Sequence, residues 1–139
     1  MPELANPFSI RVYWEDTDAG GVVYYANYLK FFERARTEWL RALGVQQHTL
    51  RQQTGAIFVV ADVQLRYLAP AKLDDLLSIS VKLLERGQAS MLLEQQAWRG
   101  DTQLANCRIR IGCVDATTLR PRRMPDALKN LLPVPASPD

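Results

Sequence analysis

The chain begins with a stretch in which apolar and polar side chains alternate, over residues 8–15. Alternation with a period of two is typical of a β-strand that buries one face. A polar turn with two glycines, residues 16–21, follows directly. The sequence therefore predicts a strand over residues 8–15 that ends in a turn. Its predicted buried face carries Phe8, Ile10, Val12 and Trp14.

From about Tyr24 to Leu43 the apolar positions recur with a period near 3.6, which is typical of an amphipathic helix. Gly44 is suited to end this helix, because glycine adopts the left-handed conformation of a helix C-terminus without steric cost. At 1.5 Å per residue the helix is about 30 Å long, and it needs a large apolar surface to lie against. Its apolar stripe comprises Tyr28, Leu29, Phe32, Ala35, Trp39, Leu40 and Leu43.

The second half of the chain supplies this surface as a set of predicted strands. Alternation returns at residues 61–67, 78–83 and 105–113, with a less regular stretch at 89–98. Turn residues separate the later runs, and strands joined by short turns are expected to pair as an antiparallel meander.

These elements predict one α+β domain over residues 1–139, an antiparallel sheet curled around one long helix. One further helical turn is expected near residues 126–132. Residues up to about 7, and those from about 133 onward, are expected to be loose ends.

Composition and charge narrow the function without assigning one. A chain of 139 residues has room for one core, and 47% hydrophobic with 23% charged residues is typical of a globular protein. A net charge of +2 gives no reason to expect a nucleic-acid partner. No apolar run reaches the roughly 18 residues of a membrane span. The first residues lack a signal-peptide pattern, so a cytoplasmic protein is expected.

The cysteines and the single histidine suggest no metal site and no nucleophilic triad. Cys107 and Cys113 lie on one predicted strand, about 20 Å apart, which is too far for a disulfide. We expect both to be buried thiols. His48 follows the predicted helix without a partner for a triad or a zinc set, so we expect a solvated side chain. No GxSxG, GxxxxGK or GxGxxG motif occurs.

Three carboxylates stand within residues 15–18, between the first predicted strand and the helix. Such residues are common in solvated turns and near helix N-termini, and this interpretation stays open. However, Gly20 and Gly21 let a ligand approach the backbone closely. The unpaired N–H groups of the first helical turn can also hold an oxyanion. A carboxylate beside such donors suits acyl transfer, as a base on water or as the nucleophile.

Two further groups of residues have alternative interpretations. The aromatic residues of segment 24–32 fit either a helix core or a ligand pocket. The basic run of Arg120, Arg122 and Arg123 is either a solvated turn or a binding site for coenzyme phosphates. The second interpretation is open because the arginine guanidinium group can donate two parallel hydrogen bonds to a phosphate group.

The segment VYWEDTDAGGVVYYANYLKFFERARTEWL resembles the signature region of the 4-hydroxybenzoyl-CoA thioesterase family, and is most similar to its Tol-Pal-associated acyl-CoA thioesterase branch. RYLAPAKLDD and CVDATTLRPRRMP extend this similarity over nearly the whole chain. The resemblance implies a hot-dog fold, dimers paired into tetramers, and active sites at subunit interfaces. It also implies hydrolysis of acyl-CoA, or of an acyl group on a carrier protein, with no cofactor.

By position, the resemblance makes Asp18 the catalytic carboxylate and the backbone N–H of Tyr25 the oxyanion donor. It suggests substrate contacts for Trp14, Gly21, Tyr24 and Ser90. Relatives in this branch often carry His in place of Tyr25 and Tyr in place of Trp14. The alternative functions are a hydratase or dehydratase acting on acyl thioesters, and a non-catalytic acyl-binding or scaffold protein.

Overall fold

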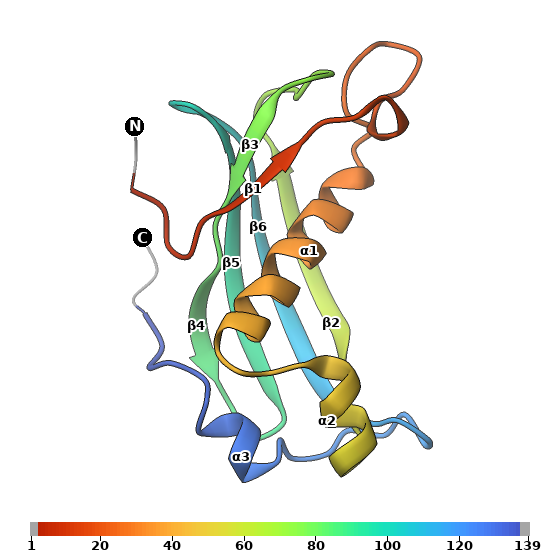
Figure 1. Ribbon diagram of the computed structural model, residues 1–139, viewed down its shortest axis with the longest axis vertical. Helices are drawn as coiled ribbons and strands as arrows, with labels where there is room; N and C mark the ends of the chain where they lie inside the picture. The colour runs from red at the N-terminus through yellow and green to blue at the C-terminus, as the bar shows by residue number, and fades with distance from the viewer. Residues whose placement is uncertain (1–2, 137–139) are drawn as a thin grey trace.

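The computed structural model describes residues 3–136, in which one long helix lies across a face of an antiparallel sheet (Figure 1). No helix among these residues has the length and apolar character needed to cross a membrane. The strands are β1 (Phe8–Arg11), β2 (Ala56–Tyr67), β3 (Leu76–Ile79), β4 (Lys82–Arg86), β5 (Ser90–Arg99) and β6 (Thr102–Asp115). The helices are the 3-10 turn η1 (Trp14–Asp16), α1 (Asn27–Ala42), α2 (Gln47–Thr54) and α3 (Asp126–Lys129).

The strands lie in the order β1-β3-β5-β6-β2, and β4 pairs with the other half of β5. The β4–β5 and β5–β6 hairpins fulfil the expectation of an antiparallel meander. That expectation is wrong for β2 and β3. Among residues 3–136, β2 pairs only with β6, while β3 pairs with β1 and β5. The loop of residues 68–75 is long enough to carry the chain from one side of the sheet to the other. The arrangement is the predicted α+β hot-dog fold.

The helix α1 supplies the middle of the core. Phe31 is fully buried, whereas Leu29, expected in the apolar stripe, is 41% exposed. The buried face is therefore largely the predicted stripe, with Phe31 buried in place of Leu29. At the other end, Gly44 has φ +94°, and Val45 N–H donates to the Leu40 carbonyl, as predicted for a glycine-terminated helix. The buried residues of α1 are Tyr28, Phe31, Phe32, Ala35, Trp39 and Leu40.

The first strand is shorter than predicted. β1 ends at Arg11, and the chain then turns through η1, so Trp14 is 78% exposed rather than on the buried face. A 3-10 turn has three residues per turn, so side chains in it no longer alternate between two faces as they do in a strand. The apolar–polar alternation of the sequence continues through this turn and therefore does not reveal where the strand ends.

Three further differences and two confirmed predictions concern the rest of the chain. The predicted strand 78–83 is divided into β3 and β4. The helix α2 was not predicted, because it buries no side chain and so has no apolar period; it contains the exposed His48. The predicted helical turn near 126–132 is confirmed as α3, and both cysteines are buried free thiols on β6. Ala5 and Ala136, in the end segments expected to be loose, form backbone hydrogen bonds with Val81 and Leu83.

Candidate active site

Residues 17–26, which we call the Asp18 loop, connect η1 to α1. The loop folds back on itself, because Asp18 N–H donates to the Val22 carbonyl (2.9 Å) and Gly21 N–H to the Asp18 carbonyl (3.1 Å). Gly20 N–H donates to Asp18 Oδ1 (2.8 Å), which orients the carboxylate. The side chain is otherwise exposed, so it is fixed in direction yet open to a ligand.

Both glycines of this loop are required, for different reasons. Gly21 has φ +79°, a left-handed conformation that other residues adopt only with strain. A Cβ on Gly20 would lie 3.2 Å from Asp18 Oδ1, which is tighter than an ordinary contact. Side chains at these positions would strain the turn or displace the carboxylate.

The helix begins with two free donors. α1 starts at Asn27, later than the predicted Tyr24, but its first turn is prepared by bonds from Asn27 N–H to the Tyr24 carbonyl and from Tyr28 N–H to the Tyr25 carbonyl. Within residues 3–136, the N–H groups of Tyr25 and Ala26 donate no hydrogen bond. They stand at the positive end of a 16-residue helix, where an oxyanion is stabilised.

Asp16 has a different role from Asp18. Its carboxylate is buried and accepts a hydrogen bond from Tyr13 N–H (2.9 Å). Its carbonyl accepts from Tyr24 N–H (3.0 Å) and from Asn27 Nδ2 (2.9 Å). Asp16 therefore ties η1 to the start of α1, and its side chain points away from the solvent that Asp18 faces.

An aromatic row continues from the loop into the core. The rings of Tyr24 and Tyr25 lie 4.7 Å apart, Tyr25 and Tyr67 6.1 Å, and Tyr67 and Tyr28 5.3 Å. The Tyr67 hydroxyl donates to the Tyr25 carbonyl (2.7 Å). Burial and the neighbouring tyrosines raise the pKa of Tyr67, so this donor stays protonated. Segment 24–32 therefore supplies the core through Tyr28, as one interpretation predicts, while the exposed Tyr25 lies beside a hollow and the ligand-pocket interpretation stays a prediction.

That hollow, about 310 Å³ in volume, is lined in part by Tyr25 and is mostly apolar. It could hold part of an acyl group. Its lining consists of Val23, Tyr25, Tyr28, Tyr67, Leu68, Ala69 and Pro70.

The structure brings Asp18, Gly21, Tyr24 and Tyr25 together in one loop that follows directly from Trp14. It does not bring Ser90 or the arginine run to this loop within one chain. Arg122 Nη1 donates to the Thr54 carbonyl, next to the start of β2, whereas Tyr67 at the end of β2 contacts Tyr25.

At about 3.4 Å per residue, the 12 residues of β2 separate these two places by about 35–40 Å. In Figure 1 the β4–β5 turn, where Ser90 begins β5, lies with α3 at the opposite end of the sheet from the loop that precedes α1.

The basic residues at that far end have partners of their own. Arg123 Nη2 and Lys129 Nζ both donate to Gln88 Oε1, at 3.0 and 3.1 Å. Arg110 Nη1 donates to Ser90 Oγ (3.3 Å). Two cations thus share one neutral oxygen, an arrangement that an anion could join.

Sequence reasoning missed Tyr67, whose role depends on a contact 42 positions away in the chain. It also assigned no role to Asp75 and Arg99, although both lie in a polar network that contacts the loop of residues 70–75. No local pattern signals such contacts. Among residues 3–136, no group of three or more His, Cys, Asp and Glu side chains is placed to hold a metal ion.

The fold and the loop define a hot-dog domain with a carboxylate before the helix N-terminus. Residues 12–132 match the Thioesterase-like superfamily, and the chain belongs to this family. It is 45% identical, over 91% of its length and 94% of the relative, to a Haemophilus influenzae protein named acyl-CoA thioesterase YbgC. An Escherichia coli protein named acyl-CoA thioester hydrolase YbgC is 41% identical over 86% of this chain and 89% of its own.

A solved structure of a probable thioesterase from Bartonella henselae superposes with a TM-score of 0.81. It is 35% identical and the match covers 86% of this chain and 98% of that one. The similarity therefore extends over nearly the whole domain, including the Asp18 loop.

The buried carboxylate of Asp16 gives a prediction for stability. Asp16→Ala removes the acceptor of Tyr13 N–H and should lower the free energy of unfolding by about 1–3 kcal/mol, measured by urea denaturation. Asp16→Asn keeps an acceptor oxygen and should cost less. Equal stability of Asp16→Ala and the wild type would contradict this structural role.

Proposed function

We propose that this chain hydrolyses the thioester bond of acyl-CoA to give a free acid and CoA. The observation that carries the proposal is the pairing, in one short loop, of the oriented Asp18 carboxylate with the free N–H of Tyr25 at the start of α1. Membership of the thioesterase-like family and the names of the two YbgC relatives support it.

In the proposed reaction, the thioester carbonyl oxygen accepts a hydrogen bond from Tyr25 N–H. Negative charge develops on this oxygen in the tetrahedral transition state, where a fixed donor at the positive end of a helix is most effective. The apolar hollow beside Tyr25 receives the acyl group. No metal is needed for these steps.

Asp18 has two possible roles in this reaction. As a base, it takes a proton from water while the water oxygen attacks the carbonyl carbon; the C–S bond then breaks, and the departing sulfur takes this proton from Asp18 and leaves as the CoA thiol. As a nucleophile, its carboxylate oxygen attacks the carbon and expels CoA, and water then cleaves the mixed anhydride. The exposed carboxylate is compatible with both.

The proposed assembly is a homodimer formed through β2, with two dimers in a tetramer. β2 is a 12-residue strand that, within the part of the chain that the structure describes, pairs with β6 on one side only. Unpaired strand edges are normally covered in a native protein. This edge also exposes apolar side chains, namely Val59, Val60 and Val63, as well as Tyr67 at its end.

Antiparallel pairing of two β2 strands would complete the site. It would place the Thr54 end of one β2 beside the Tyr67 end of the other. The arginine run and Ser90 of the partner would then approach the Asp18 loop, although about 35–40 Å separates them within one chain. The carrier of the acyl group, the Tol-Pal association and the cytoplasmic location remain predictions from the sequence.

The assembly is tested by light scattering. The purified chain at micromolar concentration should have a mass of two or four chains, because the β2 edge is apolar and unpaired. A stable monomer would contradict both the dimer and the shared site.

The arginine run is proposed to hold the phosphates of CoA. Arg120 and Arg123 are exposed, whereas Arg122 is half-buried against the Thr54 carbonyl. Arg123→Ala should therefore raise KM for acyl-CoA several-fold with kcat nearly unchanged, the pattern of lost uniform binding.

An acyl-pantetheine thioester, which lacks the nucleotide and its phosphates, provides the control for this prediction. Its KM should be the same for Arg123→Ala and the wild type. If KM for acyl-CoA is unchanged in variants at Arg120, Arg122 and Arg123, the run is a solvated basic turn.

The central prediction is the effect of Asp18→Asn. The amide keeps the size of the carboxylate and can still accept from Gly20 N–H, so the loop should fold, but the amide is neither a base nor a nucleophile. We expect kcat to fall about 10²–10⁴-fold, or further if Asp18 is the nucleophile. Activity is measured as release of CoA thiol.

Asp16→Asn is the matched control for this variant, because it makes the same chemical change two positions earlier. It should lose much less activity, since the Asp16 side chain contacts Tyr13 rather than the solvent-facing side of the loop. Near-wild-type kcat in Asp18→Asn, or a larger loss in Asp16→Asn, would reject Asp18 as the catalytic carboxylate.

A further inference from the structure

The loop of residues 68–75, between β2 and β3, is hydrogen-bonded to the Asp18 loop. Val23 N–H donates to the Ala71 carbonyl (2.8 Å), and Ala71 N–H donates to the Tyr28 hydroxyl oxygen (3.1 Å). Val22 and Lys72 form an isolated β-bridge. Ala71 is fully buried. Its two hydrogen bonds hold the chain on both sides of Tyr25, at Val23 two residues before it and at Tyr28 three residues after it.

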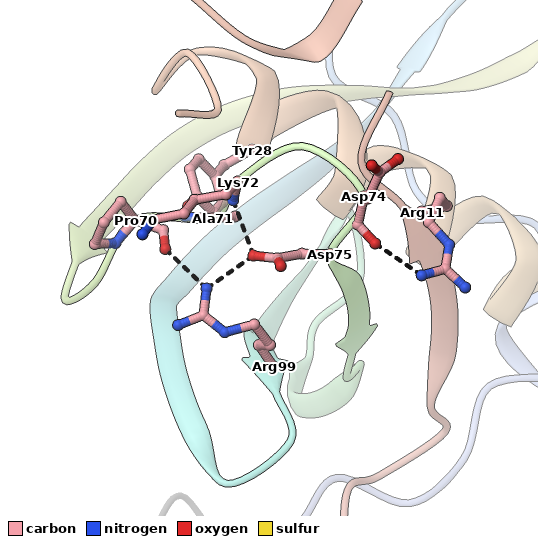
Figure 2. A network of polar contacts seen from close by, with 8 residues as sticks. All are labelled: Arg11, Tyr28, Pro70, Ala71, Lys72, Asp74, Asp75 and Arg99. Atoms are coloured by element: carbon pink, nitrogen blue, oxygen red, sulfur yellow. Dashed lines mark hydrogen bonds and ion pairs between the residues drawn. The ribbon is translucent and has the colours of Figure 1, made fainter. Parts of the chain in front are cut away.

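One arginine of the sheet fixes this loop at two points. Arg99, the last residue of β5, donates through Nη1 to the Pro70 carbonyl (3.1 Å) and to Asp75 Oδ2 (2.8 Å). The same Asp75 oxygen accepts from Lys72 N–H (2.9 Å). Figure 2 shows the Arg99 side chain reaching both ends of the 70–75 segment, with Ala71 and Tyr28 beyond it.

The ion pair between Arg99 and Asp75 keeps both of its charges at neutral pH. The side chains of Arg99 and Asp75 are 37% and 22% exposed, so solvent screens their interaction only in part. Partial burial opposes ionisation of Asp75, but the Lys72 N–H and Arg99 outweigh it and lower the pKa of this carboxyl group. Asp75 is therefore ionised at neutral pH. Burial raises the pKa of Tyr28, whose hydroxyl stays intact as the acceptor for Ala71.

We propose that Arg99 is a positioning residue for the hydrolysis, acting through Pro70 and Asp75 on Ala71 and so on the Tyr25 N–H. This inference rests on the proposed function, because it assigns the Tyr25 N–H to the oxyanion. Arg99 itself contacts no substrate. It determines where the donor stands relative to Asp18, and displacements of about 1 Å at such a site can cost about 100-fold in rate.

The kinetic test compares Arg99→Ala with wild type. A misplaced oxyanion donor weakens binding of the transition state more than binding of the substrate. We expect kcat to fall about 10–100-fold with KM changed less than about threefold. Arg99→Lys should recover most of kcat, because one ammonium nitrogen can donate to both oxygens that Arg99 Nη1 contacts. Unchanged kcat in Arg99→Ala, or no recovery in Arg99→Lys, would overturn the proposal.

Arg108→Ala is the matched control for general destabilisation. Arg108, on the neighbouring strand β6, pairs with the buried Glu94 of β5 (3.5 Å), and its side chain is about as exposed as that of Arg99. Its loss should lower Tm without lowering kcat. An equal fall of kcat in Arg108→Ala and Arg99→Ala would reduce Arg99 to an ordinary stabilising residue.

A second measurement separates this proposal from the proposed function. The Val23 amide, which donates to Ala71, should exchange hydrogen at least about tenfold faster in Arg99→Ala than in the wild type, and at the wild-type rate in Arg108→Ala. A wild-type chain that hydrolyses no acyl-CoA would overturn the proposed function. Hydrogen exchange at Val23 requires no turnover, so it would still test the proposal in that case. Faster exchange in Arg99→Ala would support control of the loop by Arg99, and an unchanged rate would overturn it.

Discussion

The burial of one face of α1 against the sheet is the constraint on which the rest of the structure depends. Phe31 and Phe32 are fully buried and Tyr28 nearly so, all within the first two turns of the helix. Burying each such side chain contributes about 1.5–3 kcal/mol, more than the roughly 1 kcal/mol of a single loop hydrogen bond. Core packing therefore fixes where the helix begins, and with it the position of the free N–H groups of Tyr25 and Ala26.

The polar contacts then decide which groups remain available for chemistry. Asp16 uses its carboxylate and its carbonyl to connect η1 with the helix start, and Tyr67 binds the Tyr25 carbonyl. After these bonds are made, the Asp18 carboxylate is still exposed, and the Tyr25 N–H has no acceptor within residues 3–136. Two carboxylates so close in sequence thus differ in environment, since Asp16 is buried and Asp18 is exposed.

The sequence predicted the parts of this structure that depend on local periods and turn chemistry. The long helix, its end at Gly44, the strand around Cys107 and the loop before the helix all follow from patterns within a few residues. The misses involve contacts between distant segments. Trp14 continues the alternation of β1 but lies in a 3-10 turn, and the separation of β2 from β3 is set by pairing with β6. The role of Arg99 likewise depends on contacts 24 and 29 positions away.

Hydrolysis of acyl-CoA is measured most directly as steady-state release of free CoA thiol by the wild-type chain from a panel of acyl-CoA thioesters. The panel should vary in chain length and include an aromatic acyl group, since the hollow beside Tyr25 is lined mostly by apolar and aromatic side chains. We expect saturable turnover of at least one thioester without added metal or cofactor. Binding of these thioesters without any release of thiol would contradict it and would make the chain an acyl-binding protein.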